Sequence, residues 1–222
     1  MSRYYLLAIL LLSSTIGFTQ KFKRFSGLLE YKITAEDTSL ANLYPETRMV
    51  IYTNDTIVRM ENQTSSLGKQ VTIRHAEKQK AYQLLETEFG KFAIKADLTD
   101  KPDSIPASDS YTFDKKCKRK KILGKKAVVY EVNQEAYKAT KDFLFYKNYS
   151  NKYLNTFEDV PYLPVVYYVT TYDVILKYEL VRMSEYTPDR DLFGIPSDYE
   201  RVTFDEFLDK YLEFKGQNNN QE

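Results

Sequence analysis

The stretch TRMVIYTNDTIVRMEN (Thr47–Asn62) shows most directly how this chain folds. Two strand-like segments, Thr47–Thr53 and Thr56–Asn62, stand on either side of Asn54 and Asp55. Asn and Asp tolerate a positive φ angle, which a two-residue hairpin turn requires. The stretch therefore predicts an antiparallel hairpin with a tight turn.

The same period-two pattern continues on both sides of this hairpin. Phe25, Gly27, Leu29, Tyr31 and Ile33 alternate with the residues between them, as in a strand with one buried face. Further strand pairs are predicted for Lys69–His75 with Ala81–Thr87, Tyr111–Ile122 with Ala127–Asn133, and Val165–Thr170 with Val174–Met183, and a single strand for Lys141–Lys147. Successive hairpins predict a mainly β fold with minor α: a strongly curved antiparallel sheet or half-open β-barrel.

Three segments depart from the strand pattern. Asp97–Ser110 holds two Pro and many turn-forming residues, which favours a loop, and Asn148–Pro164 has room for a short helix. Thr203–Phe214 predicts the one clear helix: Thr203 and Glu206 match a capping box, and apolar residues recur at helical spacing. We expect this helix to dock on the sheet and to end at Gly216.

The first residues have the features of a secretory signal peptide. Arg3 precedes an apolar run, Tyr4 to Leu12, that is too short to cross a bilayer, and small residues follow it. We expect residues 1–19 to be removed, 20–215 to form a single domain and 216–222 to be a disordered tail. The expected mature protein is periplasmic or secreted, has no transmembrane span and, because its single Cys is Cys117, is not a lipoprotein.

The composition excludes several classes of function. The 222 residues include one Cys and one His, too few for a Cys/His zinc site or a disulfide framework. Lys and Arg number 32 against 31 Asp and Glu, which argues against a globally basic nucleic-acid binder. The nucleotide-binding and hydrolase motifs based on Gly, Ser or His are absent from the sequence. We therefore expect no enzyme activity, no cofactor, no metal and no nucleic-acid partner.

The two residues with catalytic potential lack companions. His75 shares the phase of Val71 and Ile73 on a predicted strand, so it can face inward, but no nucleophile or orienting acid is evident for it. Cys117 lies among lysines, which favour its thiolate, yet it has no resolving Cys. A structural or incidental role is the interpretation that we favour for both.

A basic run is the strongest local anomaly of the sequence. Eight cations fall within twelve residues: Lys115, Lys116, Lys118, Arg119, Lys120, Lys121, Lys125 and Lys126. One interpretation is a charge-protected edge strand, or a strand close to residues 185–222, which carry ten acids and four bases. The other is a site for an anionic partner, such as a phosphorylated lipid headgroup or an acidic protein surface.

The aromatic residues also allow two interpretations. Tyr and Phe number 20 and 13, and most of them lie on predicted strands. Leu29, Tyr31, Tyr130, Phe143 and Phe145 are expected to line one apolar face, which is either a filled core or a cavity for a hydrophobic or lipidic ligand. The Tyr-rich segment 162–172, with Tyr167, Tyr168 and Tyr172, is a candidate exposed contact surface.

Four stretches resemble a known family. They are FSGLLEYKIT (Phe25–Thr34), KKILGKKAVVYEV (Lys120–Val132), YLPVV (Tyr162–Val166) and FGIPSDYERVTFDEF (Phe193–Phe207). Together they resemble the GLPGLI-type secreted family of Gram-negative bacterial envelopes, a domain of unknown function. The resemblance implies a half-open barrel similar to that of the LolA/LolB lipoprotein carriers. The resulting hypothesis is a non-enzymatic envelope protein that binds a hydrophobic or lipidic ligand. The alternative is a protein–protein interaction module that uses the basic strand 115–126 and the Tyr-rich segment.

Overall fold

The computed structural model describes residues 21–64, 68–78, 80–97, 111–154, 156–157, 159–171 and 174–218. The expected signal peptide, residues 1–19, lies outside the described residues, as do most of the predicted loop 97–110 and residues 219–222 of the predicted tail. No helix in the described part of the chain is long and apolar enough to cross a membrane.

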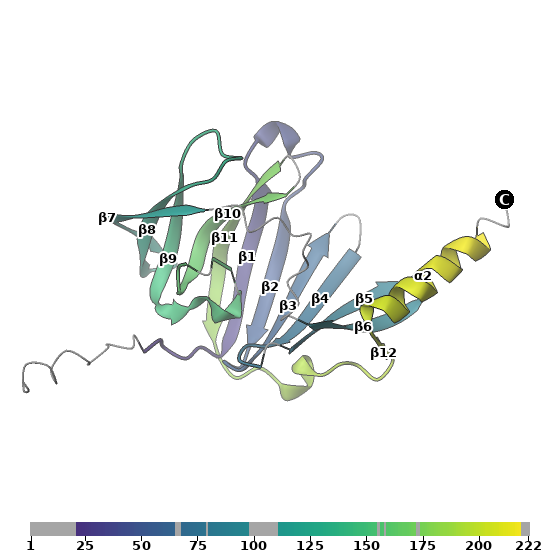
Figure 1. Cartoon of the computed structure of the whole chain (residues 1–222). Helices are drawn as coiled ribbons and strands as arrows, with labels where there is room; N and C mark the ends of the chain where they lie inside the picture. The colour runs from purple at the N-terminus through teal and green to yellow at the C-terminus, as the bar shows by residue number, and fades with distance from the viewer. Residues whose placement is uncertain are drawn as a thin grey trace, which may run out of the picture.

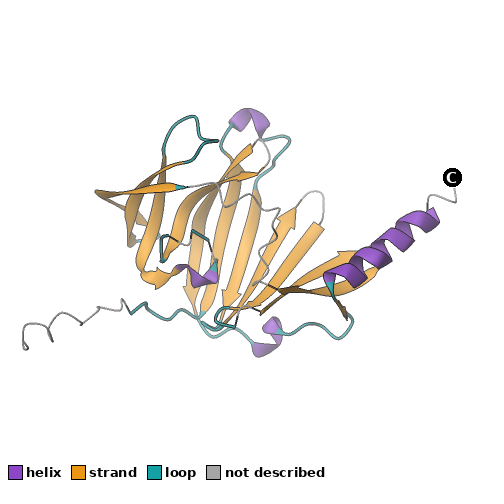
Figure 2. Ribbon diagram, viewed as in Figure 1, coloured by secondary structure: helices purple, strands orange, loops and turns teal. Residues whose placement is uncertain are grey.

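Twelve strands form one large sheet (Figures 1 and 2). The strands are β1 (Gly27–Ala35), β2 (Thr47–Thr53), β3 (Ile57–Thr64), β4 (Gly68–His75), β5 (Lys80–Thr87), β6 (Gly90–Asp97), β7 (Thr112–Ile122), β8 (Lys125–Asn133), β9 (Lys141–Ser150), β10 (Tyr162–Thr171), β11 (Val174–Glu185) and β12 (Glu200–Val202). Three short 3₁₀ helices, η2 (Thr38–Leu40), η3 (Asn151–Tyr153) and η4 (Arg190–Phe193), and the helix α2 (Phe204–Asn218) complete the described elements.

The order across the sheet is β12-β6-β5-β4-β3-β2-β1-β11-β10-β9-β8-β7. From β1 the chain proceeds strand by strand to β6, continues at the opposite edge with β7, and returns to the middle, where β11 pairs with β1. All pairs are antiparallel except β12 with β6. Figure 1 shows a curved sheet that does not close, so β7 and β12 remain separate edges.

This architecture confirms the predicted mainly β fold with a curved antiparallel sheet and a C-terminal helix. The Asn54–Asp55 turn is present: Asp55 has a φ angle of 77°, and the Asn54 side chain accepts hydrogen bonds from the backbone N of Thr56 and Ile57. The short helix expected between residues 148 and 164 is η3. The predicted strands did not include β6, which follows directly after the recognised β5, or β12, which directly precedes the recognised helix α2.

The main core lies on the face of the sheet that carries Leu29 and Tyr31, called the core face below. Leu29 stands opposite Ile51 on β2 and Met183 on β11, and this cluster extends across β10, β9 and β8. The segment after η3 adds Phe157, whose ring packs 5.4 Å from that of Phe143. The core is therefore filled by strand side chains and this segment rather than by α2.

Two smaller clusters stabilise the β3–β6 side of the sheet. Val71, Ile73, Leu84 and Ala93 lie on the opposite face and are covered by residues of the segment that leads to β12, Ile195 and Tyr199. The guanidinium of Arg59 donates to the carbonyl of Leu192 at 3.1 Å, which holds the same segment in place. On the core face, Phe92, Ile94 and Val202 form a third cluster.

The helix α2 begins with the predicted capping box. The backbone N of Thr203 donates to the Glu206 carboxylate at 2.6 Å, and the backbone N of Glu206 donates to the Thr203 hydroxyl at 3.2 Å. Phe207 docks against Phe92 in the third cluster, but Phe204, Leu208 and Leu212 remain exposed. The expected docking is thus limited to the edge formed by β6 and β12. The predicted stop at Gly216 was wrong, because the helix continues to Asn218.

Candidate functional site

Four of the five residues predicted to contact an apolar ligand are fully buried. Leu29, Tyr31, Phe143 and Phe145 expose none of their surface, whereas Tyr130 is half-buried. Tyr31 donates a hydrogen bond to the carbonyl of Pro164 at 2.8 Å, and burial raises the pKa of its hydroxyl well above the ordinary value. These four side chains form packed core, so a ligand would reach them only if neighbouring side chains moved. Tyr130 is the member of the set that remains accessible.

The predicted basic strand is the edge strand β7 with the turn into β8. Two of its cations are neutralised: Lys116 pairs with Asp114 at 2.6 Å, and Lys120 pairs with Asp142 at 2.9 Å. The other six are exposed and form no ion pair with another described residue: Lys115, Lys118, Arg119, Lys121, Lys125 and Lys126. The register shift between Lys115 and Arg119 and the lysines both protect this edge from pairing with another strand.

The basic strand is distant from most of the acidic C-terminal part. β7 and β12 are the two edges of the sheet, and α2 follows β12. Glu185, the first acid of residues 185–222, is the exception, because Lys23 and, to a smaller extent, Lys125 lower the pKa of its carboxyl. For the acids of β12 and α2, the interpretation that they neutralise the basic strand within one chain is wrong. The interpretation of β7 as a charge-protected edge is right, because topology places it at the end of the strand order.

A pocket of about 490 Å³ opens where β7, β8 and β9 meet. Its cations are Arg119, Lys125, Lys126 and Lys147, and its other lining residues are Val128, Tyr146, Asn148 and Tyr149. The lining contains no acid, and we call this site the basic pocket. Its position follows from strand pairing, because β7 and β9 flank β8 on either side.

Register explains why cations from three strands converge there. Arg119 stands opposite Val128, Val128 stands opposite Phe145, and Lys147 follows two residues after Phe145. These residues therefore share the core face, at the end of the aromatic cluster. Lys147 was not among the predicted site residues. The signal that would have found it is the alternation Phe143, Phe145, Lys147 within a strand that was predicted.

Like charges crowd the basic pocket. Lys115 lowers the pKa of the Lys147 ammonium, and partial burial and Arg119 lower it further. The same ammonium lies 5.4 Å from the ring centre of Tyr162. Tyr130 lies near Tyr162, because burial and the neighbouring Tyr162 together raise the pKa of its hydroxyl. An anion placed in the pocket would relieve the repulsion, and Tyr130 and Tyr162 would border its apolar part.

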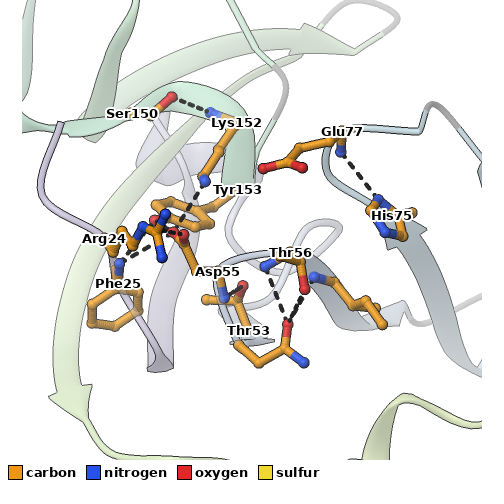
Figure 3. A network of polar contacts seen from close by, with 12 residues as sticks. Arg24, Phe25, Thr53, Asp55, Thr56, His75, Glu77, Ser150, Lys152 and Tyr153 are labelled. Atoms are coloured by element: carbon orange, nitrogen blue, oxygen red, sulfur yellow. Dashed lines mark hydrogen bonds and ion pairs between the residues drawn. The ribbon is translucent and has the colours of Figure 1, made fainter. Parts of the chain in front are cut away.

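A second, wider pocket of about 790 Å³ adjoins the first at Asn148. It carries four further cations, Lys21, Lys23, Arg24 and Lys152, together with Asp55 and Glu77. Figure 3 shows that the Asp55 carboxylate forms an ion pair with Lys152 at 3.0 Å and accepts a hydrogen bond from the Tyr153 hydroxyl at 2.6 Å. Because Asp55 already engages these partners, this pocket is a structural junction next to the basic one.

The candidate catalytic residues are not brought together. His75 lies at the end of β4, where its Nδ1 accepts hydrogen bonds from the backbone N of Glu77 (Figure 3) and from that of Lys78. Cys117 is exposed in the irregular part of β7. Among the residues that the structure describes, no three His, Cys, Asp or Glu side chains cluster as metal ligands.

The Tyr-rich segment 162–172 is mainly interior. Tyr167 is 2% exposed and stacks on Tyr178 with ring centres 4.7 Å apart, and Tyr168 is half-buried. Tyr172 lies outside the described residues. The segment is interior because β10 lies between β9 and β11. The proposed contact surface on this segment is therefore not available at Tyr167.

The fold and the pocket define a class: a mainly β protein with an open, curved sheet and a basic pocket at one end of its aromatic core. No protein-family model matches the chain, and no curated protein matches it significantly.

Proposed function

We propose that this protein is exported to the cell envelope and binds an anionic amphiphile there without catalysis. The charged group of the ligand lies in the basic pocket, and its apolar part lies against Tyr130 and Tyr162. The observation that carries this proposal is the convergence of Arg119, Lys125 and Lys126 with Lys147 around a pocket without an acid. Four cations gathered in one pocket attract an anion more strongly than a single paired surface charge does.

The apolar part of the ligand is assigned to the margin of the core because the interior is filled. Phe143 and Phe145 are fully buried, while Tyr130 and Tyr162 are half-buried; Tyr162 lies beside Lys147 of the pocket, and Tyr130 lies near Tyr162. This arrangement suits a ligand with one chain or a small apolar body rather than one enclosed on all sides. Because cations lie beside this apolar margin, we expect the hydrophobic ligand to carry a negative charge as well.

The envelope location rests on the sequence. Arg3 and the apolar run after it support export, and the resemblance to the GLPGLI-type family supports an envelope protein with a LolA/LolB-like half-barrel. The open curved sheet agrees with that type of barrel. The location is tested by following the full-length protein in cell fractions; retention in the cytoplasm with residues 1–19 uncleaved would contradict it.

Binding is tested by calorimetry with the mature chain, residues 20–222, and dodecyl phosphate below its micellar concentration. The variant Arg119→Gln/Lys147→Gln removes two pocket cations. Each cation near an anionic group contributes about 1 kcal/mol, so roughly 30-fold weaker binding is expected. The matched control Lys118→Gln/Lys121→Gln removes the same amount of charge from β7, at positions outside the pocket lining, and should bind as the wild type does.

Two further probes separate the parts of the ligand. Inorganic phosphate tests the charge alone, and dodecyl maltoside tests the apolar chain alone. Both should bind more weakly than dodecyl phosphate. Equal binding of the neutral detergent, or an unchanged affinity in the pocket variant, would contradict the proposal.

A second candidate function is an interaction module for acidic envelope proteins. The exposed cations of β7 favour it, but the burial of Tyr167 removes the other half of its expected surface. Charge reversal of Lys118, Arg119 and Lys120 should abolish binding to such a partner. Unchanged co-purification of envelope proteins with this variant would count against it.

A further inference from the structure

The helix α2 exposes an apolar row that no described element covers. Phe204, Leu208 and Leu212 follow one another at intervals of four residues and are 61%, 40% and 58% exposed. Figure 1 shows α2 extending away from the sheet beyond β6 and β12. Phe207, on the adjacent side of the helix, packs against Phe92 and Phe89. The helix is thus anchored along one stripe, and the apolar row lies beside that stripe.

A row of acids runs beside this apolar row. Each of the three apolar residues is followed directly by an acid: Asp205, Asp209 and Glu213. These acids are exposed and form no ion pair with a described residue. Lys210, by contrast, pairs with Glu200 at 3.3 Å. An amphipathic helix with this pattern is recognised by a groove that supplies cations together with apolar contact. A basic surface with apolar side chains would therefore complement this face.

The basic pocket has the required chemistry. It presents Arg119, Lys125, Lys126 and Lys147, and the neighbouring turn exposes Leu123 to 46% of its surface. Within one chain the two surfaces cannot meet, because β7 and β12 are the opposite edges of the sheet. Neighbouring strands lie about 4.8 Å apart, so the separation between β7 and β12 measured along the sheet is roughly 50 Å.

We propose that a second copy of this chain docks the acidic and apolar face of its α2 against the basic pocket and Leu123 of the first copy. The contact is heterologous, since each copy offers α2 at one edge and the pocket at the other. Such contacts extend into rings or open chains of molecules rather than into a closed symmetric dimer. This inference needs no bound ligand, but both occupants use the basic pocket, so α2 of a second copy and the anionic amphiphile would compete for it.

Sedimentation of the mature wild-type chain is the first measurement. Association should increase with protein concentration at low ionic strength and should weaken in 1 M salt, where the Debye length is about 3 Å. A wild-type chain that stays monomeric at low salt and high concentration would overturn the proposal.

Two variants then separate the halves of the contact. The helix variant Asp209→Lys/Glu213→Lys keeps the pocket, and the strand variant Arg119→Gln/Lys126→Gln keeps α2 and places no acid opposite the lysines of the helix variant. Each alone should be monomeric. Their mixture should form a 1:1 dimer that does not grow, because one intact helix meets one intact pocket. If circular dichroism shows that both variants are folded, absence of this dimer would overturn the proposal.

The controls address charge and a different occupant. Glu135→Lys/Asp159→Lys makes the same charge change as the helix variant at exposed positions outside both surfaces, and it should associate as the wild type does. Vesicles of phosphatidylglycerol test the alternative that α2 binds a lipid surface. Vesicle binding that needs the α2 face, in a protein that does not self-associate, would assign the helix to a membrane and overturn the proposal.

Discussion

The hydroxyl of Tyr153 donates a hydrogen bond to the Asp55 carboxylate at 2.6 Å, although the two residues are 98 positions apart. The same hydroxyl accepts a hydrogen bond from the backbone N of Phe25 at 3.0 Å. Lys152 adds an ion pair to Asp55 at 3.0 Å (Figure 3). One polar junction therefore joins the segment before β1, the β2–β3 turn and η3.

Removal of the Tyr153 hydroxyl should destabilise the protein. In Tyr153→Phe the ring keeps its packing, but Phe25 N and Asp55 each lose their shortest hydrogen-bond partner. We expect the free energy of unfolding to fall by about 1–3 kcal/mol, measured by urea denaturation. Tyr186→Phe, at a side chain that is 45% exposed, should change it by less than about 0.5 kcal/mol. Equal effects of the two substitutions would contradict this role of Tyr153.

Asp55 should make stability dependent on acidic pH. Burial alone would raise the pKa of its carboxyl, but hydrogen bonds from Tyr153 and Lys152 outweigh burial and lower it below the ordinary 3.8. Because the folded pKa is the lower one, the stabilisation is complete above pH 3.8 and is lost as the pH falls through the folded pKa. Asp55→Asn should be less stable than the wild type at pH 7. Denaturation at several pH values should show that this gap, the difference in free energy of unfolding between the two proteins, closes below pH 3.8. A gap that is constant with pH would contradict the assignment.

Phe143 tests whether the aromatic cluster is packed core. Its ring has no exposed surface and lies 5.4 Å from Phe157 and 6.2 Å from Tyr111. Phe143→Ala should therefore lower the free energy of unfolding by roughly 3–5 kcal/mol in protein freed of lipid. Tyr44→Ala serves as the control, because this side chain is exposed. If Phe143→Ala left stability unchanged, the residue would line an open ligand cavity instead.

Gly27 is required where β1 begins against β11. Its φ angle is 143°, and a Cβ there would stand 1.9 Å from the carbonyl oxygen of Ser184. Gly27→Ala should lower the free energy of unfolding by roughly 3 kcal/mol or more, or prevent folding, as measured by thermal denaturation. Gly216→Ala meets no atom within 4 Å and lies in α2, so it should be neutral or slightly stabilising. A tolerated Ala at Gly27 would show that β1 and β11 separate without loss of the fold.

Most of the strands could be predicted from the sequence because their signals are local. The Asn54–Asp55 turn and the capping box of Thr203 and Glu206 each depend on a few adjacent residues, and both are present in the structure. β12 was missed because three residues are too few to show a period, and its partner β6 reaches it only through tertiary structure. The extent of α2 was misjudged because a Gly near a helix end is tolerated as well as terminating.

The sequence by itself determined the strand pattern, the basic run and the abundance of aromatic residues, because alternation, turn residues and charge are properties of short segments. The tertiary structure decided where these features lie. Pairing of β1 with β11 and placement of β7 at the far edge buried Tyr31 and Phe143, added Lys147 to the predicted cations, and separated β7 from α2. Such contacts join residues far apart in the chain, so they depend on strand order and register, which no local pattern specifies.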